Sequence, residues 1–176
     1  MQRVATNPRH RIGFGMAVLL LAAAPLLPVP TWALDTPEAR ATLKGVRLLR
    51  VKVDVDTPGL AQDGLTKEQL QKEVEGRLGA AGIVVAPINY AALPMLWVVL
   101  TTDKVPAADL YAASIKVAFF QYVRLGRGPE TGAPAATWEL EGVGSVPASD
   151  ASELRSWVRD YVDRFIAAFL EQNPKP

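Results

Sequence analysis

The sequence contains no cysteine, and its single histidine, His10, lies near the amino terminus. Without cysteine the chain can form neither a disulfide nor a thiolate nucleophile, and beyond His10 it has no imidazole to act as a general base or a metal ligand. It also lacks the glycine-rich phosphate-binding loops of nucleotide-binding proteins and the Gly-x-Ser-x-Gly elbow of serine hydrolases. Because the commonest catalytic and metal-binding chemistry is missing, we predict no catalytic residue, no metal site and no cofactor.

The first 33 residues have the three-part pattern of an export signal. A basic start containing Arg3 precedes an apolar run over residues 12–27, and Thr31 and Ala33 place small residues at the −3 and −1 positions of a cleavage site. The alternative is an uncleaved membrane anchor, but the prolines that end the apolar run favour cleavage. We therefore expect a cleavable signal peptide at 1–33 and a periplasmic or secreted protein. The alternative is an inner-membrane anchor, in which only the uncleaved signal contacts the membrane.

The charge of the remaining chain gives no reason to expect nucleic acid as a partner. Removal of the signal takes away three arginines, which leaves 16 basic residues against 18 acidic ones and a net charge of −2. No cysteine follows the signal, so lipid attachment of the bacterial lipoprotein kind is excluded. We expect residues 34–42 to form a short tether and residues 43–173 to form a single domain, long enough to bury a core without disulfides.

Alternation and capping patterns predict four main strands and two helices after the tether. We expect the strands at residues 49–56, 96–100, 114–125 and 137–144, with a short additional strand directly after residue 82. A helix is expected over 66–81, because Thr66 opens a capping box and Gly82 suits a left-handed end, and a second helix with a wide apolar stripe is expected over 150–172. The stretch 126–136 is rich in glycine, proline and alanine and predicts a loop. This order, β-α-β-β-β-α, predicts an α+β fold with a mainly antiparallel sheet of about four strands, a meander covered on one face by two helices.

The third main strand carries aromatic and basic side chains on the face opposite its apolar one, and a glycine-containing loop follows it. Such side chains are enriched at protein interfaces. The candidate binding residues are Lys116, Phe120, Tyr122, Arg124 and Arg127. The alternative is that a helix or the loop 87–94 covers this face, since large exposed apolar patches are uncommon.

Paired carboxylates supply the main catalytic alternative. Asp54 and Asp56 lie on one side of a strand, about 7 Å apart at their alpha carbons, and Glu139 and Glu141 repeat this arrangement on another strand. Such pairs perform acid and base roles in glycoside hydrolysis. Both pairs occupy the polar half of an alternating strand, however, where charged residues are expected for solubility alone. An irregular calcium site that uses Asp54, Asp56 and Asp63 is a further alternative, although a turn after the strand explains these residues better.

The signal, the capped helix beginning Leu65-Thr66-Lys67-Glu68-Gln69-Leu70, the strand Thr137-Trp138-Glu139-Leu140 and the long terminal helix together resemble small exported proteins of Gram-negative-type bacteria. In element order the chain is also similar to small envelope-assembly domains, such as the lipopolysaccharide-assembly lipoprotein and the amino-terminal domain of the Tol propeller protein. The resemblance implies a periplasmic adaptor and transfers no functional residue.

We accordingly expect a non-enzymatic binding or adaptor protein whose partner is an envelope protein or another component of the cell envelope. It would dock through a sheet edge, through the Phe120 and Tyr122 face, or through the loop 124–130. The alternatives are a carboxylate-based hydrolase of envelope glycans and a carrier of a lipid or another small ligand, bound between the sheet and the terminal helix.

Overall fold

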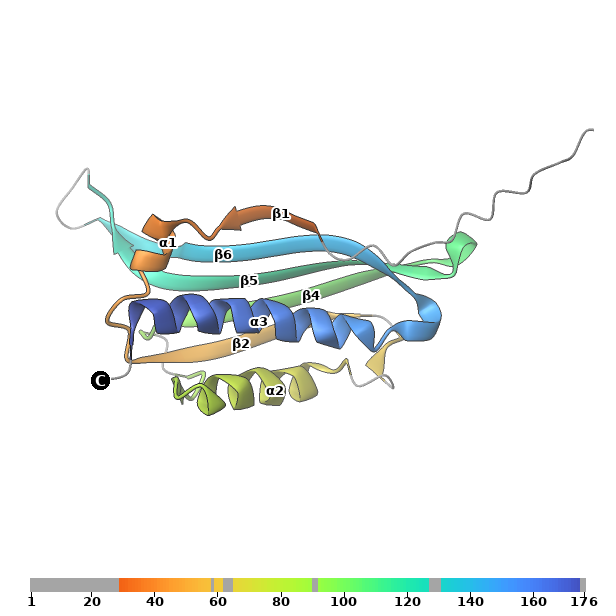
Figure 1. Cartoon of the computed structure of the whole chain (residues 1–176), viewed down its shortest axis with the longest axis horizontal. Coiled ribbons are helices and arrows are strands. Elements are labelled where there is room, and N and C mark those ends of the chain that lie inside the picture. Colours follow the sequence, from red (N-terminus) through yellow and green to blue (C-terminus); the bar gives the residue numbers. More distant parts are fainter. Residues whose placement is uncertain (1–28, 58, 62–64, 90–91, 127–130, 175–176) are drawn as a thin grey trace, which may run out of the picture.

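A computed structural model describes residues 29–57, 59–61, 65–89, 92–126 and 131–174 (Figure 1). The strands are β1 (Val29–Leu34), β2 (Leu48–Asp56), β3 (Val84–Ala86), β4 (Met95–Val105), β5 (Leu110–Arg124) and β6 (Gly132–Pro147). The helices are α1 (Pro37–Ala41), α2 (Lys67–Ala80) and α3 (Glu153–Gln172). Most of the expected signal peptide therefore lies outside the described residues.

The strands form one sheet in the order β1-β6-β5-β4-β2-β3. The pairs β1–β6, β6–β5 and β5–β4 are antiparallel, whereas β2 is parallel to its two neighbours, β4 and β3. The predicted fold class is thus confirmed: the protein is α+β with a mainly antiparallel sheet. The sheet is larger than predicted, with six strands in place of about four.

The parallel part of the sheet differs from the expected meander, and the cause is α2. This helix carries the chain back along the sheet, so β3 leaves α2 in the same direction as β2, as in other β-α-β units. β3 is short and pairs only with Leu48, Leu49 and Arg50 at the start of β2. β4 also begins beside Arg50, so the end of β3 and the start of β4 lie at the same end of the sheet.

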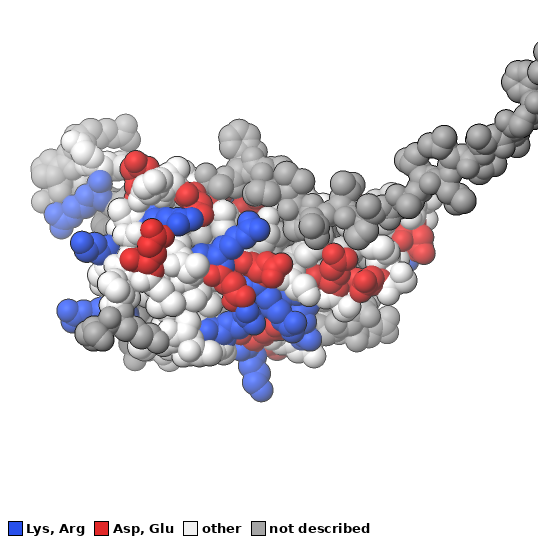
Figure 2. Space-filling model, viewed as in Figure 1, with Lys and Arg blue, Asp and Glu red and all other residues white. Residues whose placement is uncertain are grey.

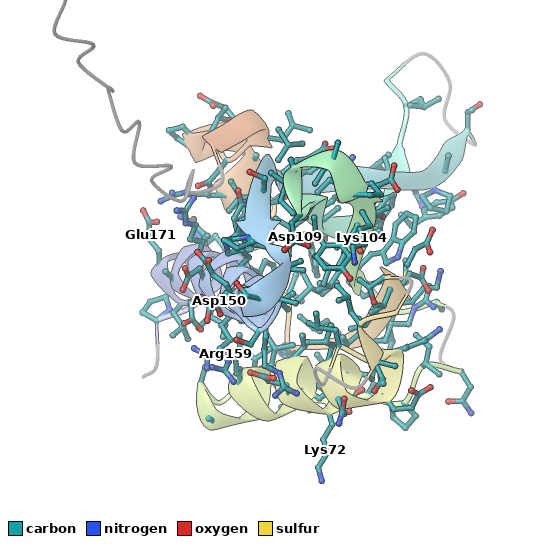
Figure 3. The ribbon with its side chains drawn as sticks, turned by 90° about the vertical axis from the view of Figure 1, so that its right-hand side faces the viewer. Lys72, Lys104, Asp109, Asp150, Arg159 and Glu171 are labelled. Carbon is teal, nitrogen blue, oxygen red and sulfur yellow. The ribbon has the colours of Figure 1, made fainter. Side chains whose placement is uncertain are left out.

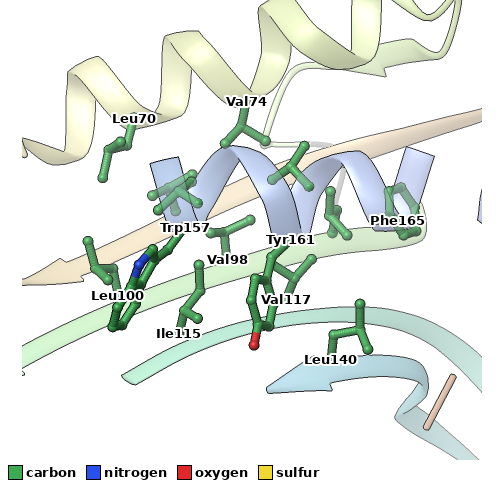
Figure 4. Close-up of a cluster of buried hydrophobic side chains, with 14 of the residues drawn as sticks. Leu70, Val74, Val98, Leu100, Ile115, Val117, Leu140, Trp157, Tyr161 and Phe165 are labelled. Carbon is green, nitrogen blue, oxygen red and sulfur yellow. The ribbon is translucent and has the colours of Figure 1, made fainter. Parts of the chain in front are cut away.

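Both long helices cover the same face of the sheet, as predicted (Figures 1 and 4). Alternate residues of β2, β4 and β5 point toward them and are fully buried. The sides that α2 and α3 present to the sheet are also apolar. The Phe165 ring of α3 packs against the rings of Phe119 and Trp138, with centroid distances of 5.5 and 5.2 Å respectively. At about 1.5–3 kcal/mol for each large apolar side chain, this layer supplies most of the favourable energy of folding.

The predicted helix ends are confirmed for α2 and corrected for α3. The Thr66 hydroxyl accepts a hydrogen bond from the Gln69 backbone amide (3.3 Å), and Gly82 has a φ of 84°, a left-handed conformation that favours glycine. The terminal helix begins at Glu153, three residues later than expected, with Ser152 at its N-cap. The Asp150 carboxylate accepts from the Ser152 hydroxyl (3.1 Å), and no side chain caps this helix.

The segment before β2 is more ordered than the expected tether. Residues 34–42 contain α1, which Thr36 caps by accepting from the Ala39 amide (3.2 Å). The Asp35 carboxylate accepts from Arg40 (2.6 and 2.8 Å) and from the Trp138 indole (2.7 Å), which fixes the segment to β6. Cleavage after Ala33 would remove all of β1 except Leu34, and with it every β1–β6 pair but that of Leu34 with Glu139. The domain boundaries themselves remain predictions.

The loop expected at 126–136 is shorter than predicted, because β6 begins at Gly132. This glycine pairs with Arg124, and the Tyr122 ring lies over it. A Cβ at this position would meet Tyr122 at 2.5 Å. Residues 132–136 are glycine, alanine and proline, which do not produce the alternation of apolar and polar side chains by which a strand is recognised in a sequence.

Replacement of a core ring tests whether the helix-facing layer stabilises the fold. We predict that Phe165→Ala lowers the free energy of unfolding by about 3–5 kcal/mol, because it leaves a cavity between three aromatic neighbours. Tyr161→Phe is the matched control, since it removes only a buried hydroxyl that has no hydrogen-bond partner among the described residues. Denaturant unfolding monitored by circular dichroism measures both, and a Phe165→Ala loss below that of Tyr161→Phe would contradict this prediction.

Candidate functional site

The second face of the sheet is not covered by α2 or α3, and its side chains meet solvent in the described part of the chain. Residues of β2, β4, β5 and β6 that alternate with the core residues form this surface, which we call the open face. Its described members include Lys52, Asp54, Trp97, Val99, Lys116, Phe120, Tyr122, Glu139 and Glu141. By contrast, ion pairs cover the helix side, where Glu73 binds Arg155 and Arg159 and Asp163 binds Arg77 (Figure 2).

Trp97 is held in a fixed position at the centre of the open face. Its indole donates a hydrogen bond to the Asp54 carboxylate (2.8 Å), and the Lys52 ammonium lies 4.8 Å from the ring centroid. The Phe120 ring packs against it with a centroid distance of 5.8 Å. Neighbouring strands bring these side chains together, because β4 pairs with both β2 and β5. The result is an aromatic surface with little freedom to rearrange.

A hollow of about 240 Å³ lies beside this aromatic surface, at the end of the sheet where β5 finishes. Its lining residues are Arg50, Ala92, Leu93, Met95, Phe120, Gln121, Tyr122 and Pro134. The Tyr122 side chain is 68% exposed, the largest exposed fraction among the described large apolar residues. The lining is mainly apolar, with the Arg50 guanidinium as its charged group. Arg50 itself is held in place, because its Nε donates to the Leu93 carbonyl (3.3 Å).

The structure divides the five candidate binding residues among different places. Phe120 and Tyr122 line the hollow together, and Arg124 is exposed two residues further along the same strand. Lys116 lies elsewhere on the open face, where its ammonium pairs with Glu141 (3.1 Å) and Glu139 (3.4 Å). The hydrogen bond with Glu141 is the largest cause that raises the pKa of Lys116. Arg127 lies outside the described residues.

Sequence reasoning missed Arg50, Trp97 and Met95 as members of the site. Each belongs to a strand that the sequence identifies correctly, but the hollow forms only because β4 lies between β2 and β5. No local sequence pattern predicts the parallel pairing of β2 with β4, and the order of elements led us to expect an antiparallel meander instead. The apolar residues Leu93 and Met95 on either side of Pro94 are the sequence feature that indicates an apolar surface at the start of β4.

Three of the four carboxylates of the catalytic alternative bind lysines, whereas Asp56 is exposed at the end of β2. Asp54 pairs with Lys52 (2.5 Å) and Lys67 (3.5 Å), and the Lys52 contact is the largest cause that lowers the Asp54 pKa. Glu139 and Glu141 both pair with Lys116. A general acid in glycoside hydrolysis needs a raised carboxyl pKa, which is the opposite of the shift at Asp54. Among the described residues no three acidic or histidine side chains could together hold a metal ion, and Asp63 lies outside those residues.

The sequence matches no family model and no curated protein. Similar solved structures include a PelC dodecamer from Paraburkholderia phytofirmans in two crystal forms. The first has 13% sequence identity, covers 72% of this chain and 89% of that chain, and has a TM-score of 0.42. The second has 12% sequence identity, covers 71% of this chain and 87% of that chain, and has a TM-score of 0.41. A minor lipoprotein from Acinetobacter baumannii has 15% identity over 73% and 91%, with a TM-score of 0.31. Similarity at this level assigns no function. In the described part of the chain, no helix has the length and apolar character needed to cross a membrane.

The lowered pKa of Asp54 predicts a pH-dependent contribution to stability. Since the folded pKa is below the ordinary value of 3.8, the contribution is present above that value and is lost as the pH falls through the folded pKa. Because the side chain is one-third exposed and screened by water, we predict that Asp54→Asn costs about 0.5–1 kcal/mol near neutral pH and close to nothing near pH 2. Unfolding of both proteins across this range measures the difference, and a cost that does not change with pH would contradict the prediction.

Proposed function

We propose that the protein is a non-enzymatic binding protein of the bacterial cell envelope, and that it holds its partner on the open face at the Phe120 and Tyr122 end. The observation that carries the proposal is the exposed Tyr122 ring beside an apolar hollow on a face that α2 and α3 leave uncovered. Aromatic side chains that line pockets contribute disproportionately to binding energy at protein interfaces.

The rigidity of the aromatic surface supports a binding role. Trp97 is fixed by Asp54, Lys52 and Phe120 before any partner arrives. The Tyr122 ring lies over Gly132, where a Cβ would meet the ring at 2.5 Å and would require it to move. Association therefore costs less side-chain entropy than it would with mobile rings. Exposed aromatic surface reduces solubility, and a partner that covers it gives a reason for its presence.

The contacts of the described residues favour this role over the two alternatives. A hydrolase of this kind would need a pair of carboxyl groups, at least one of them free to exchange protons; Asp54, Glu139 and Glu141 bind lysines, which leaves Asp56 without a free partner carboxylate in its pair. A carrier with its ligand between the sheet and α3 would need space there, but Phe119, Trp138 and Phe165 pack together in that layer.

The location in the envelope rests on the export signal of the sequence. A basic start, an apolar run and the small residues Thr31 and Ala33 are the features that support export. The net charge of −2 after removal of the signal supports a partner other than nucleic acid. We therefore place the protein in the periplasm, with an envelope protein or another envelope component as its partner.

Truncation of the exposed ring tests the proposed function. We predict that Tyr122→Ala abolishes or weakens by about tenfold the specific capture of a partner from envelope extract, because the ring is the exposed part of the hollow. Val143→Ala is the matched control, since it removes a 46% exposed apolar side chain from the open face of β6.

The measurement is quantitative mass spectrometry of proteins and glycans retained by the exported protein, with folding of each variant verified by circular dichroism. Capture that Tyr122→Ala leaves intact, or that Val143→Ala reduces equally, would count against a site at this end of the face.

A further inference from the structure

The end of the molecule that contains the hollow carries an excess of free positive charge. Four lysine or arginine residues have no ion pair, hydrogen bond or ring contact through their side chains in the described part of the chain: Lys44, Arg47, Lys72 and Arg124. Three of the four lie at this end of the sheet. The fourth, Lys72, projects from α2 away from the body of the molecule (Figure 3). Basic side chains also project from the corresponding end in Figure 2, on the left.

The free cations adjoin the aromatic hollow. Lys44 and Arg47 line a second hollow of about 390 Å³ that shares Leu93 and Gln121 with the first one. On the other side, Arg124 follows Tyr122 on the same face of β5. The apolar hollow therefore lies between basic side chains from two parts of the chain. We call Lys44, Arg47 and Arg124 the basic rim.

Among the described residues, the acidic side chains near this end do not neutralise the basic rim; Glu130, which follows Arg124 in the sequence, lies outside the described residues. Asp35 and Glu171 both pair with Arg40, at 2.6 and 2.9 Å. Glu38 on α1 is exposed and is a single charge against three. Elsewhere on the described surface most lysines and arginines pair with carboxylates, as Lys116 does with Glu139 and Glu141, although Lys72 is unpaired and Lys104 and Arg164 lie over aromatic rings. Unpaired cations gathered at one place attract a partner of opposite charge and accelerate its association.

The size of the hollow indicates what it holds. A volume of about 240 Å³ equals that of about eight water molecules, and it is below the range of about 300–1,000 Å³ that is usual for small-molecule sites. It suits one large apolar side chain.

We propose that this end of the protein binds an acidic protein segment, which inserts one apolar side chain into the hollow and places its carboxylates against the basic rim. The inference rests on the proposed function, because it names the chemistry of the partner at the same site. It adds two requirements: an anchor of side-chain size, and negative charge on both sides of that anchor.

Synthetic peptides test the inference with the exported protein purified from its host. The probe is a short fluorescent peptide with one leucine flanked on both sides by glutamates. One control peptide replaces the leucine by serine, and another replaces the glutamates by lysines. We expect fluorescence anisotropy to detect binding of the probe alone, and we expect the affinity to fall as salt rises, because the exposed charges are screened.

Charge reversal of the basic rim supplies the matched variants. We expect Lys44→Glu/Arg47→Glu to weaken binding of the probe by about tenfold or more, and Lys72→Glu to leave it unchanged. All three positions are exposed, so neither variant disturbs the core. Equal binding by the two variants, or binding of the serine peptide as tightly as the leucine peptide, would overturn the inference.

The same variants separate this inference from the proposed function. If Tyr122→Ala abolishes capture from envelope extract while Lys44→Glu/Arg47→Glu retains it, the binding site stands and the acidic partner is wrong. If both variants retain capture, the site itself is wrong. Vesicles of phosphatidylglycerol and of phosphatidylcholine test a lipid source of negative charge, and preference for phosphatidylglycerol vesicles over the probe peptide would also overturn the inference.

Discussion

The position of both long helices on one face of the sheet is the constraint on which the rest of the structure depends. α2 and α3 supply most of the cover that the apolar faces of β2, β4 and β5 require, and Leu43, Leu60 and Leu65 complete it, so the core forms on that side of the sheet. The opposite face of the same strands must then remain compatible with water. Ion pairs between lysines and carboxylates make most of the open face compatible with water. The aromatic residues Trp97, Phe120 and Tyr122 are the exception. α2 and α3 give these aromatic residues no cover, so Trp97 and Phe120 are half-buried and Tyr122 is exposed.

The same constraint explains how a binding surface can coexist with a stable fold. The helix-facing layer contains the residues whose truncation costs most, whereas the side chains of the hollow contribute little to that layer. Trp97 lies on β4, whose alternate residues belong to the core, and its indole is held on the open face by a hydrogen bond to Asp54 of β2. Variation at Tyr122 or along the basic rim can thus change the partner without changing the fold.

Much of the fold could be predicted from the sequence, because the signals are local. The alternation in β2 and the apolar stripe of α3 each predict one element, and Thr66 and Gly82 together predict the two ends of α2. The order of strands could not be predicted in the same way, because parallel pairing of β2 with β4 depends on the path of α2 and on the short β3.

The candidate site was predictable to the same limited extent. Phe120 and Tyr122 follow from alternation within one strand, but Arg50 and the segment at Leu93 come from other strands and meet them only in the folded protein. β1 was missed because its residues carry the pattern of a signal peptide.

Site-specific photo-crosslinking in the host cell tests most directly whether the open face at Tyr122 holds a partner. A photoreactive phenylalanine analogue is placed at position 122, at position 143 on the open face of β6, or at position 72 on α2, in the full-length protein. The account predicts one dominant crosslinked species from position 122, little of it from position 143 and none from position 72. Crosslinking from position 72 that equals or exceeds that from position 122 would contradict it.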